Sequence, residues 1–134
     1  MLTACSSADP LKVPSANEVL SIDATISNSH NADSKTYRGS VHIDDPKKVS
    51  EILGVFGALN HHMSIPFGTF PTPTHSIVVN DSRGINLVIF VGLDWIGGKN
   101  LISGTVAQSR ATHVTESQRA AFLKVVGIDD YRFK

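Results

Sequence analysis

Hydrophobic and polar residues alternate along much of this 134-residue chain, a pattern that is typical of β-strands. The most apolar run is residues 85–93, in which every odd position is aliphatic and the even positions are mixed. This run predicts a central strand with one fully buried face and a second face that is partly covered. The same alternation predicts strands over residues 18–26, 36–43 and 75–80, with the turn-forming segment 27–35 joining the first two.

Two segments instead have the spacing of three and four residues that marks an amphipathic helix. The first begins at residues 44–46, where a carboxylate can accept free backbone N–H groups and a proline needs no N–H partner. Gly57 is expected to end this helix. The second begins at Thr115, which forms a capping box with Gln118, and is expected to end at Gly127.

The remaining glycines suggest how the strands connect. Gly97, Gly98, Lys99 and Asn100 predict a turn, and residues 101–109 predict the strand after it. The resulting order is ββα followed by βββα. Because the connections have the length of hairpin turns, we expect an α+β fold: one antiparallel sheet of about five strands, with both helices packed on one face.

The segment 60–74 has no periodicity and contains three prolines, which exclude a helix and a central strand alike. A loop of this length in a compact domain is usually functional or wraps across another part of the fold. Large apolar side chains in such segments either cover the edge of a sheet or anchor a partner. The residues predicted to contact a partner, from the loop, from Trp95 and from the free face of the sheet, are His61, His62, Met63, Phe67, Phe70, Trp95, Val88 and Phe90.

Composition narrows the class of protein. A chain with 41% hydrophobic residues can bury the core of one domain without disulfides or metals. Lysine plus arginine (12) balances aspartate plus glutamate (12), so no positive field favours nucleic acid. No run approaches the roughly 20 apolar residues of a membrane-spanning helix.

Cys5 is the only cysteine, so the chain forms no internal disulfide. Leu2-Thr3-Ala4-Cys5 resembles the lipobox of bacterial lipoproteins, in which an aliphatic residue and small residues precede the lipidated cysteine. The resemblance implies a lipid on Cys5 and a place in the bacterial cell envelope, on the periplasmic side or at the cell surface. Residues 1–17 then form a flexible tether that is rich in serine, alanine and proline, and residues 18–134 form the folded domain. An ordinary cytoplasmic N-terminus is the alternative.

Catalytic and metal-binding patterns are weak. His42, His61, His62 and His75 are the candidate metal ligands, but no group of Cys, Asp or Glu accompanies them at a ligand spacing. No serine occupies a Gly-x-Ser-x-Gly motif, which marks a catalytic nucleophile. We therefore expect no catalytic residues, no bound metal and no cofactor.

These observations predict a non-catalytic lipoprotein of the cell envelope that binds a protein partner through residues 60–74 and the free sheet face. The lipid is its expected contact with the membrane, and the partner is expected to be another envelope protein rather than nucleic acid. Two alternatives stay open. One is an enzyme inhibitor or immunity protein that inserts the loop into a cleft, and the other is a small histidine-based metal-binding periplasmic protein or enzyme.

Overall fold

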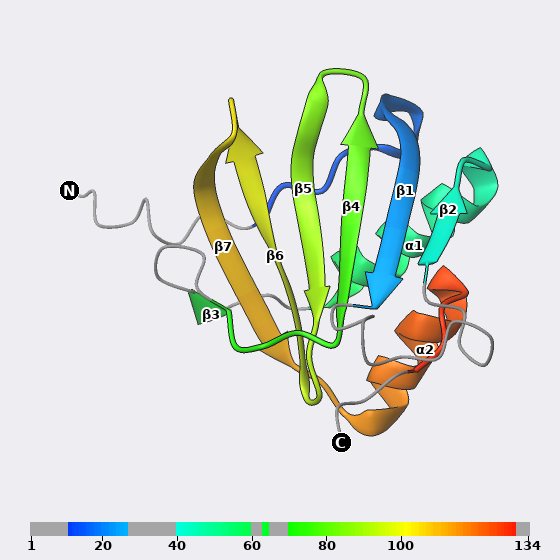
Figure 1. The fold of residues 1–134 in the computed structure, drawn as a ribbon, viewed down its shortest axis with the longest axis vertical. Coiled ribbons are helices and arrows are strands. Elements are labelled where there is room, and N and C mark those ends of the chain that lie inside the picture. Colours follow the sequence, from blue (N-terminus) through cyan, green and yellow to red (C-terminus); the bar gives the residue numbers. More distant parts are fainter. Residues whose placement is uncertain (1–10, 27–39, 60–62, 65–69, 131–134) are drawn as a thin grey trace.

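The computed structural model describes residues 11–26, 40–59, 63–64 and 70–130. In this part of the chain, one antiparallel sheet has the strand order β2-β1-β4-β5-β6-β7-β3 (Figure 1). The strands are β1 (Val19–Ile26), β2 (Ser40–Ile43), β3 (Met63–Ser64), β4 (His75–Asp81), β5 (Gly84–Val91), β6 (Trp95–Ile102) and β7 (Thr105–His113).

Of the two helices, α1 (Pro46–Ala58) passes behind the sheet in Figure 1 and α2 (Glu116–Val126) lies at the lower right. A short 3-10 turn, η2 (Ala16–Glu18), precedes β1. The α+β class and the single antiparallel sheet are therefore confirmed. The sheet is larger than the predicted five strands, because six strands have four or more residues and the two-residue β3 adds a seventh. None of the helices in the described residues is long and apolar enough to cross a membrane.

The core lies between the helices and one face of the sheet. Leu87, Ile89 and Val91 of β5 are fully buried in it, as the alternation predicted. The prediction was wrong for the two ends of the run, where Ile85 is 47% exposed and Leu93 is 51% exposed. Ile85 lies next to the β4–β5 turn, as the second residue of β5, and Leu93 lies in the bend after the strand. The helices contribute Val49, Ile52, Leu53, Phe56, Phe122, Leu123 and Val126.

The turn predicted at residues 97–100 is wrong, because all four residues lie inside β6. The hairpin turn falls later, at Ser103 and Gly104, which have φ angles of 53° and 81°. The predicted strand 101–109 is therefore split between β6 and β7. Both glycines of β6 face aromatic rings, Gly97 on one side of the sheet and Gly98 on the other, so a strand position without a side chain is what the packing requires.

The predicted helix signals hold at three of the four ends. The side chain of Asp45 accepts a hydrogen bond from the Lys47 backbone N–H at 3.1 Å. Thr115 and Gln118 form the predicted capping box, and Gly127 ends α2 in the left-handed conformation with a φ of 87°. Only the prediction for Gly57 is wrong, since α1 continues to Ala58.

Part of the segment predicted as a tether packs against the body. Leu11, Val13 and Ala16 are partly buried against the core. The backbone N–H of Lys12 donates to Oδ1 of Asn100 at 2.8 Å, and Nδ2 of Asn100 donates back to the Lys12 carbonyl at 2.9 Å. The folded body therefore includes residues 11–17.

Candidate functional site

Three of the residues predicted to contact a partner come together on the sheet face opposite the helices. The ring of Phe70 lies 5.0 Å from that of Phe90, and it stacks on Trp95 at 5.3 Å with an interplanar angle of 12°. We refer to Phe70, Phe90 and Trp95 as the aromatic cluster. Each such pair contributes about 0.5–1.5 kcal/mol beyond the burial of its apolar area.

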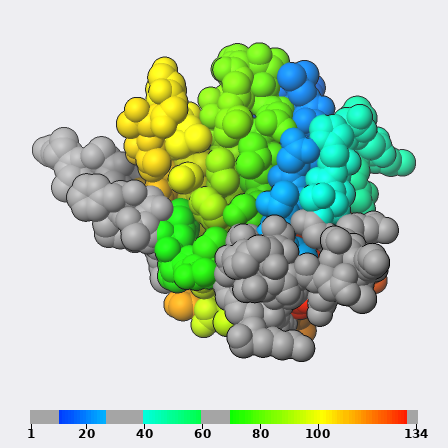
Figure 2. All heavy atoms as spheres, in the orientation of Figure 1, coloured from blue at the N-terminus to red at the C-terminus, as the bar shows by residue number. Residues whose placement is uncertain are grey.

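The cluster partly covers the even face of β5, as the sequence suggested. Phe90 is half-buried, and the ammonium of Lys99 lies 5.5 Å from the centre of its ring. Val88, paired with Lys99 across the sheet, is also half-buried. Figure 2 shows this face, on which atoms of β1, β4 and β5 reach the surface. The face is therefore partly covered by aromatic rings and partly open.

Two glycines make room for the aromatic cluster. A Cβ added at Gly92 would lie 1.9 Å from Nε1 of Trp95, inside the volume of the indole. A Cβ added at Gly97 would lie 2.8 Å from Cε1 of Phe70 and 2.6 Å from the Arg110 carbonyl oxygen. Sequence reasoning missed both roles, although glycine inside a strand pattern is the signal for a close approach of another group.

Beside the cluster is a cavity of about 370 Å³, which we call the Trp95 pocket. Its lining is Pro71, Thr72, Leu93, Asp94, Trp95, Ala111 and His113. Trp95 and Ala111 are buried, whereas Leu93, Asp94 and His113 are exposed. The pocket thus has a fixed apolar base, with one carboxylate and one imidazole at its exposed rim.

A buried arginine fixes the backbone beneath this pocket. Arg119 of α2 is fully buried, and its Nε donates to the carbonyl oxygen of Gly92 at 2.7 Å. Its Nη2 donates to Oγ1 of Thr74 at 2.9 Å, and its Nη1 donates to Oδ1 of Asp130 at 2.5 Å. Arg119 therefore connects the β5–β6 turn, the segment before β4 and the segment after α2.

His75, one of the candidate metal ligands, continues this network. Its Nε2 lies 2.8 Å from the Asp129 carbonyl, which can only accept, so Nε2 carries the proton. Its Nδ1 lies 2.7 Å from Oγ1 of Thr74, a hydroxyl that also donates to the Val91 carbonyl at 3.0 Å. Burial lowers the pKa of His75 below its usual 6.5, with the charge of Arg119 acting in the same direction. The lowered pKa favours the neutral imidazole, and both of its nitrogens lie within hydrogen-bond distance of an oxygen.

His42 lies on the other face of the sheet. Its Nδ1 is 2.5 Å from Oδ1 of Asp23, whose Oδ2 accepts from Asn80 at 2.7 Å. The hydrogen bond to Asp23 raises the pKa of His42, and the same bond lowers the pKa of Asp23. In the described residues, no group of three His, Cys, Asp or Glu side chains could hold a metal ion. His42 and His75 therefore do not converge on one site.

The other predicted site residues are less fully placed. The backbone of Met63 pairs with Ala111 of β7, so this part of the 60–74 segment lies along the edge of the sheet. Cys5, His61, His62 and Phe67 lie outside the described residues. Leu93 and His113 also line the Trp95 pocket but were not predicted, because only the register of β6 and β7 brings His113 opposite Trp95.

Comparisons of the chain with protein-family models, with curated proteins and with solved structures gave no match. The geometry of the described residues is therefore the basis for assigning a function.

Proposed function

We propose that this chain is a non-catalytic binding module that contacts a protein partner through the aromatic cluster, the Trp95 pocket and residues 60–74. The observation that carries the proposal is the Trp95 pocket itself, an apolar cavity of about 370 Å³ that opens at the surface beside stacked aromatic rings. Buried aromatic and apolar anchors dominate the energetics of protein interfaces, and they act in preformed pockets that exclude water.

Rigidity supports this role. The indole of Trp95 stacks on the Phe70 ring and occupies the space that a side chain at Gly92 would fill. The Gly92 carbonyl is in turn fixed by its hydrogen bond from Arg119. A pocket whose base is already ordered loses little conformational entropy when a partner side chain enters it. The exposed Leu93 at the rim adds apolar area that a partner can cover.

We further propose that the module is held at the bacterial cell envelope by lipid on Cys5, on the basis of the lipobox-like Leu2-Thr3-Ala4-Cys5. One acyl chain gives only marginal membrane binding, so stable anchoring needs more than one chain. When the chain is produced with a signal peptide in a bacterial host, it should partition into detergent, and Cys5→Ala should abolish this partitioning. A Cys5→Ala protein that still partitions would contradict the anchoring.

Cross-linking in a bacterial envelope fraction tests the binding surface. The purified protein is used as bait, and Leu93→Asp is compared with Leu20→Asp. Both leucines are exposed, at 51% and 64%, but only Leu93 lines the Trp95 pocket. Leu93→Asp should abolish cross-linking to the partner, while Leu20→Asp should preserve it. Equal cross-linking by both variants would show that the partner binds elsewhere.

A further inference from the structure

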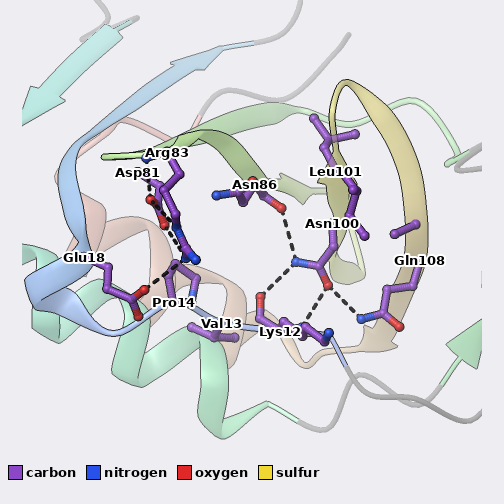
Figure 3. A pocket seen from close by; sticks show the side chains of 12 residues that line it. Lys12, Val13, Pro14, Glu18, Asp81, Arg83, Asn86, Asn100, Leu101 and Gln108 are labelled. Atoms are coloured by element: carbon purple, nitrogen blue, oxygen red, sulfur yellow. Dashed lines mark hydrogen bonds and ion pairs between the residues drawn. The ribbon is translucent and has the colours of Figure 1, made fainter.

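A second cavity, of about 560 Å³, lies at the other end of β6 from Trp95 (Figure 3). Its walls come from residues 12–18, the turn between β4 and β5, and the hairpin of β6 and β7. We call it the Arg83 groove. None of the residues in the proposed partner surface lines it, so it constitutes a separate site.

The wall nearest the N-terminal segment is preformed. The amide of Asn100, only 6% exposed, bonds to both backbone groups of Lys12. Oδ1 of Asn100 also accepts from Gln108 at 3.1 Å, and its Nδ2 lies 3.3 Å from the carbonyl of Asn86. Figure 3 shows these bonds converging on Asn100. The groove therefore does not have to order this wall when it binds a ligand.

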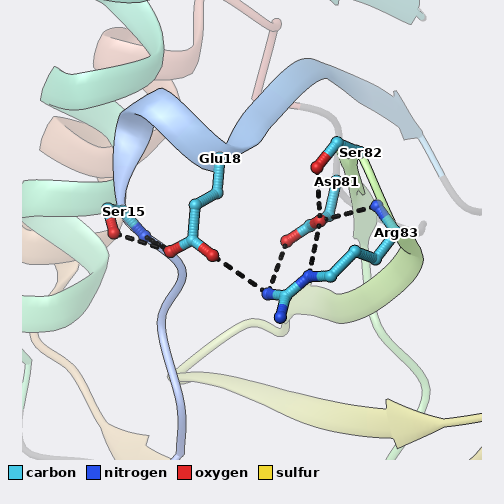
Figure 4. Close-up of polar contacts among 5 residues, drawn as sticks. All are labelled: Ser15, Glu18, Asp81, Ser82 and Arg83. Atoms are coloured by element: carbon cyan, nitrogen blue, oxygen red, sulfur yellow. Dashed lines mark hydrogen bonds and ion pairs between the residues drawn. The ribbon is translucent and has the colours of Figure 1, made fainter.

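At the opposite wall, Arg83 is held by two carboxylates (Figure 4). Its Nε lies 3.4 Å from Oδ1 of Asp81, and its Nη2 donates to Glu18 at 3.0 Å and lies 3.5 Å from Oδ2 of Asp81. Ser15 fixes the other oxygen of Glu18 at 2.7 Å. In Figure 4 one nitrogen of the Arg83 guanidinium makes no hydrogen bond and points away from both carboxylates.

This nitrogen is a donor available to a ligand. Among the described residues, no hydrogen bond reaches Nη1 of Arg83, and the side chain is 69% exposed. The ion pairs keep their charges near neutral pH. Hydrogen bonds from Arg83 lower the pKa of Asp81, those from Ser15 lower the pKa of Glu18, and the Asp81 carboxylate raises the pKa of Arg83.

The formal charges that line the groove balance, so neither anions nor cations gain a net attraction. Lys12 and Arg83 carry two positive charges, and Glu18 and Asp81 carry two negative charges, so the four sum to zero. An anion would approach two carboxylates, while a cation would find both carboxylates already bound to Arg83. The rest of the lining is mainly apolar, with Val13, Pro14, Leu101, Ile102 and Ala107.

We infer that the Arg83 groove binds a small uncharged amphipathic molecule, which places a carbonyl oxygen on Nη1 of Arg83 and an apolar chain along Val13 and Leu101. The cavity volume lies within the range of small-molecule sites, roughly 300–1,000 Å³. A few fixed polar groups among apolar walls are also typical of such sites. This binding is a function additional to partner recognition at the Trp95 pocket.

Three probes with the same eight-carbon chain test the inference: octanamide, octanoate and octylammonium. In NMR titrations of the ¹⁵N-labelled protein, octanamide should shift the backbone signals of Arg83, Asn86 and Leu101 saturably, and both ions should bind more weakly. Arg83→Met should weaken octanamide binding at least tenfold, because it removes a hydrogen bond from a charged donor. Leu93→Asp, in the other pocket, should leave it unchanged.

Ala107→Phe provides a test that leaves the ion pairs intact, because Ala107 is exposed and lines the groove. The added ring should fill the cavity and abolish octanamide binding. Tighter binding of either ion would overturn the assignment of the ligand class. Unchanged octanamide affinity in both Arg83→Met and Ala107→Phe, or the absence of saturable shifts in the wild type, would overturn the site.

Discussion

Replacing Gly97 with alanine should destabilise the protein, although Gly97 has no positive φ that alanine would resist. The new Cβ would lie 2.6 Å from the carbonyl oxygen of Arg110, and 2.8 Å from both Cβ of Ala111 and Cε1 of Phe70. Because one of these atoms belongs to the backbone of β7, rotation of a side chain cannot relieve all of the overlap. β6 and β7 must therefore move apart, and Phe70 must also shift from its position.

The expected change in the free energy of unfolding for Gly97→Ala is the sum of opposing contributions. A buried methyl group contributes about 0.8 kcal/mol, and the less flexible unfolded chain contributes about 0.4–1 kcal/mol. Overpacking costs about 1–3 kcal/mol. Displacing Phe70 also breaks its contacts with Phe90 and Trp95, which contribute about 0.5–1.5 kcal/mol each. We expect a net loss of about 1–2 kcal/mol, and therefore a decrease in Tm of roughly 3–8 °C.

Thermal denaturation followed by tryptophan fluorescence tests this, because Trp95 is the only tryptophan and stacks on Phe70. Gly97→Ala should lower Tm and shift the emission of Trp95 to longer wavelength. The matched control is Gly54→Ala in α1, where a Cβ meets no atom within 4 Å and better helix propensity should raise stability by about 0.5–1 kcal/mol. A Gly97→Ala protein with unchanged Tm and emission would refute the packing argument.

Three further results are expected. Arg119→Met should lower the free energy of unfolding in urea by roughly 3 kcal/mol, because it removes every bond of a buried cation and leaves Asp130 without this partner. The pKa of His75 is lower in the folded protein than in the unfolded chain, so its contribution to the free energy of unfolding is constant above about pH 6.5. Below that pH the unfolded chain binds the proton first, and stability should fall. His75→Phe should therefore reduce the dependence of the urea midpoint on pH. His42 should titrate above pH 6.5 by NMR, and Asp23→Asn should lower its pKa.

Local patterns in the sequence predicted much of the fold. The buried positions of β5 followed from alternation, because the face of each strand residue depends on its parity alone. The start of α1 at Asp45 and both ends of α2 followed from capping residues, whose bonds span three or four positions. These features need no knowledge of distant contacts.

Features that depend on distant residues were predicted wrongly or not at all. The local sequence around Gly97 and Gly98 predicts a turn. It does not show that these glycines make room for Phe70 and Phe56, because both rings belong to other segments of the chain. Arg119 has the sequence context of an exposed helix residue. It is buried because Gly92, Thr74 and Asp130 satisfy it, and the folded topology brings these three residues together.

The same contrast explains why the residues of the aromatic cluster could be named from the sequence and the Trp95 pocket could not. Large apolar residues in irregular segments are visible in the sequence, and Phe70 and Trp95 were chosen on that basis. The pocket requires the register in which Trp95 lies opposite His113 and Gly97 lies opposite Ala111. Register depends on how the whole hairpin pairs, and the sequence pattern predicts the hairpin turn at residues 97–100, several residues before its position at Ser103 and Gly104.

Gly97 and Gly98 connect the core to the proposed binding face. Gly98 accepts the Phe56 ring, whose nearest atom would lie 3.2 Å from an added Cβ, on the helix side of β6, and Gly97 accepts Phe70 on the opposite side. A substitution at Gly97 should therefore change stability and partner binding together, since the cluster and the sheet share that space. A substitution at the exposed Leu93 should change binding alone. If Gly97→Ala lowered stability but left the cross-linking of the partner intact, the aromatic cluster would be a structural cover, and the proposed interface would reduce to the rim of the Trp95 pocket.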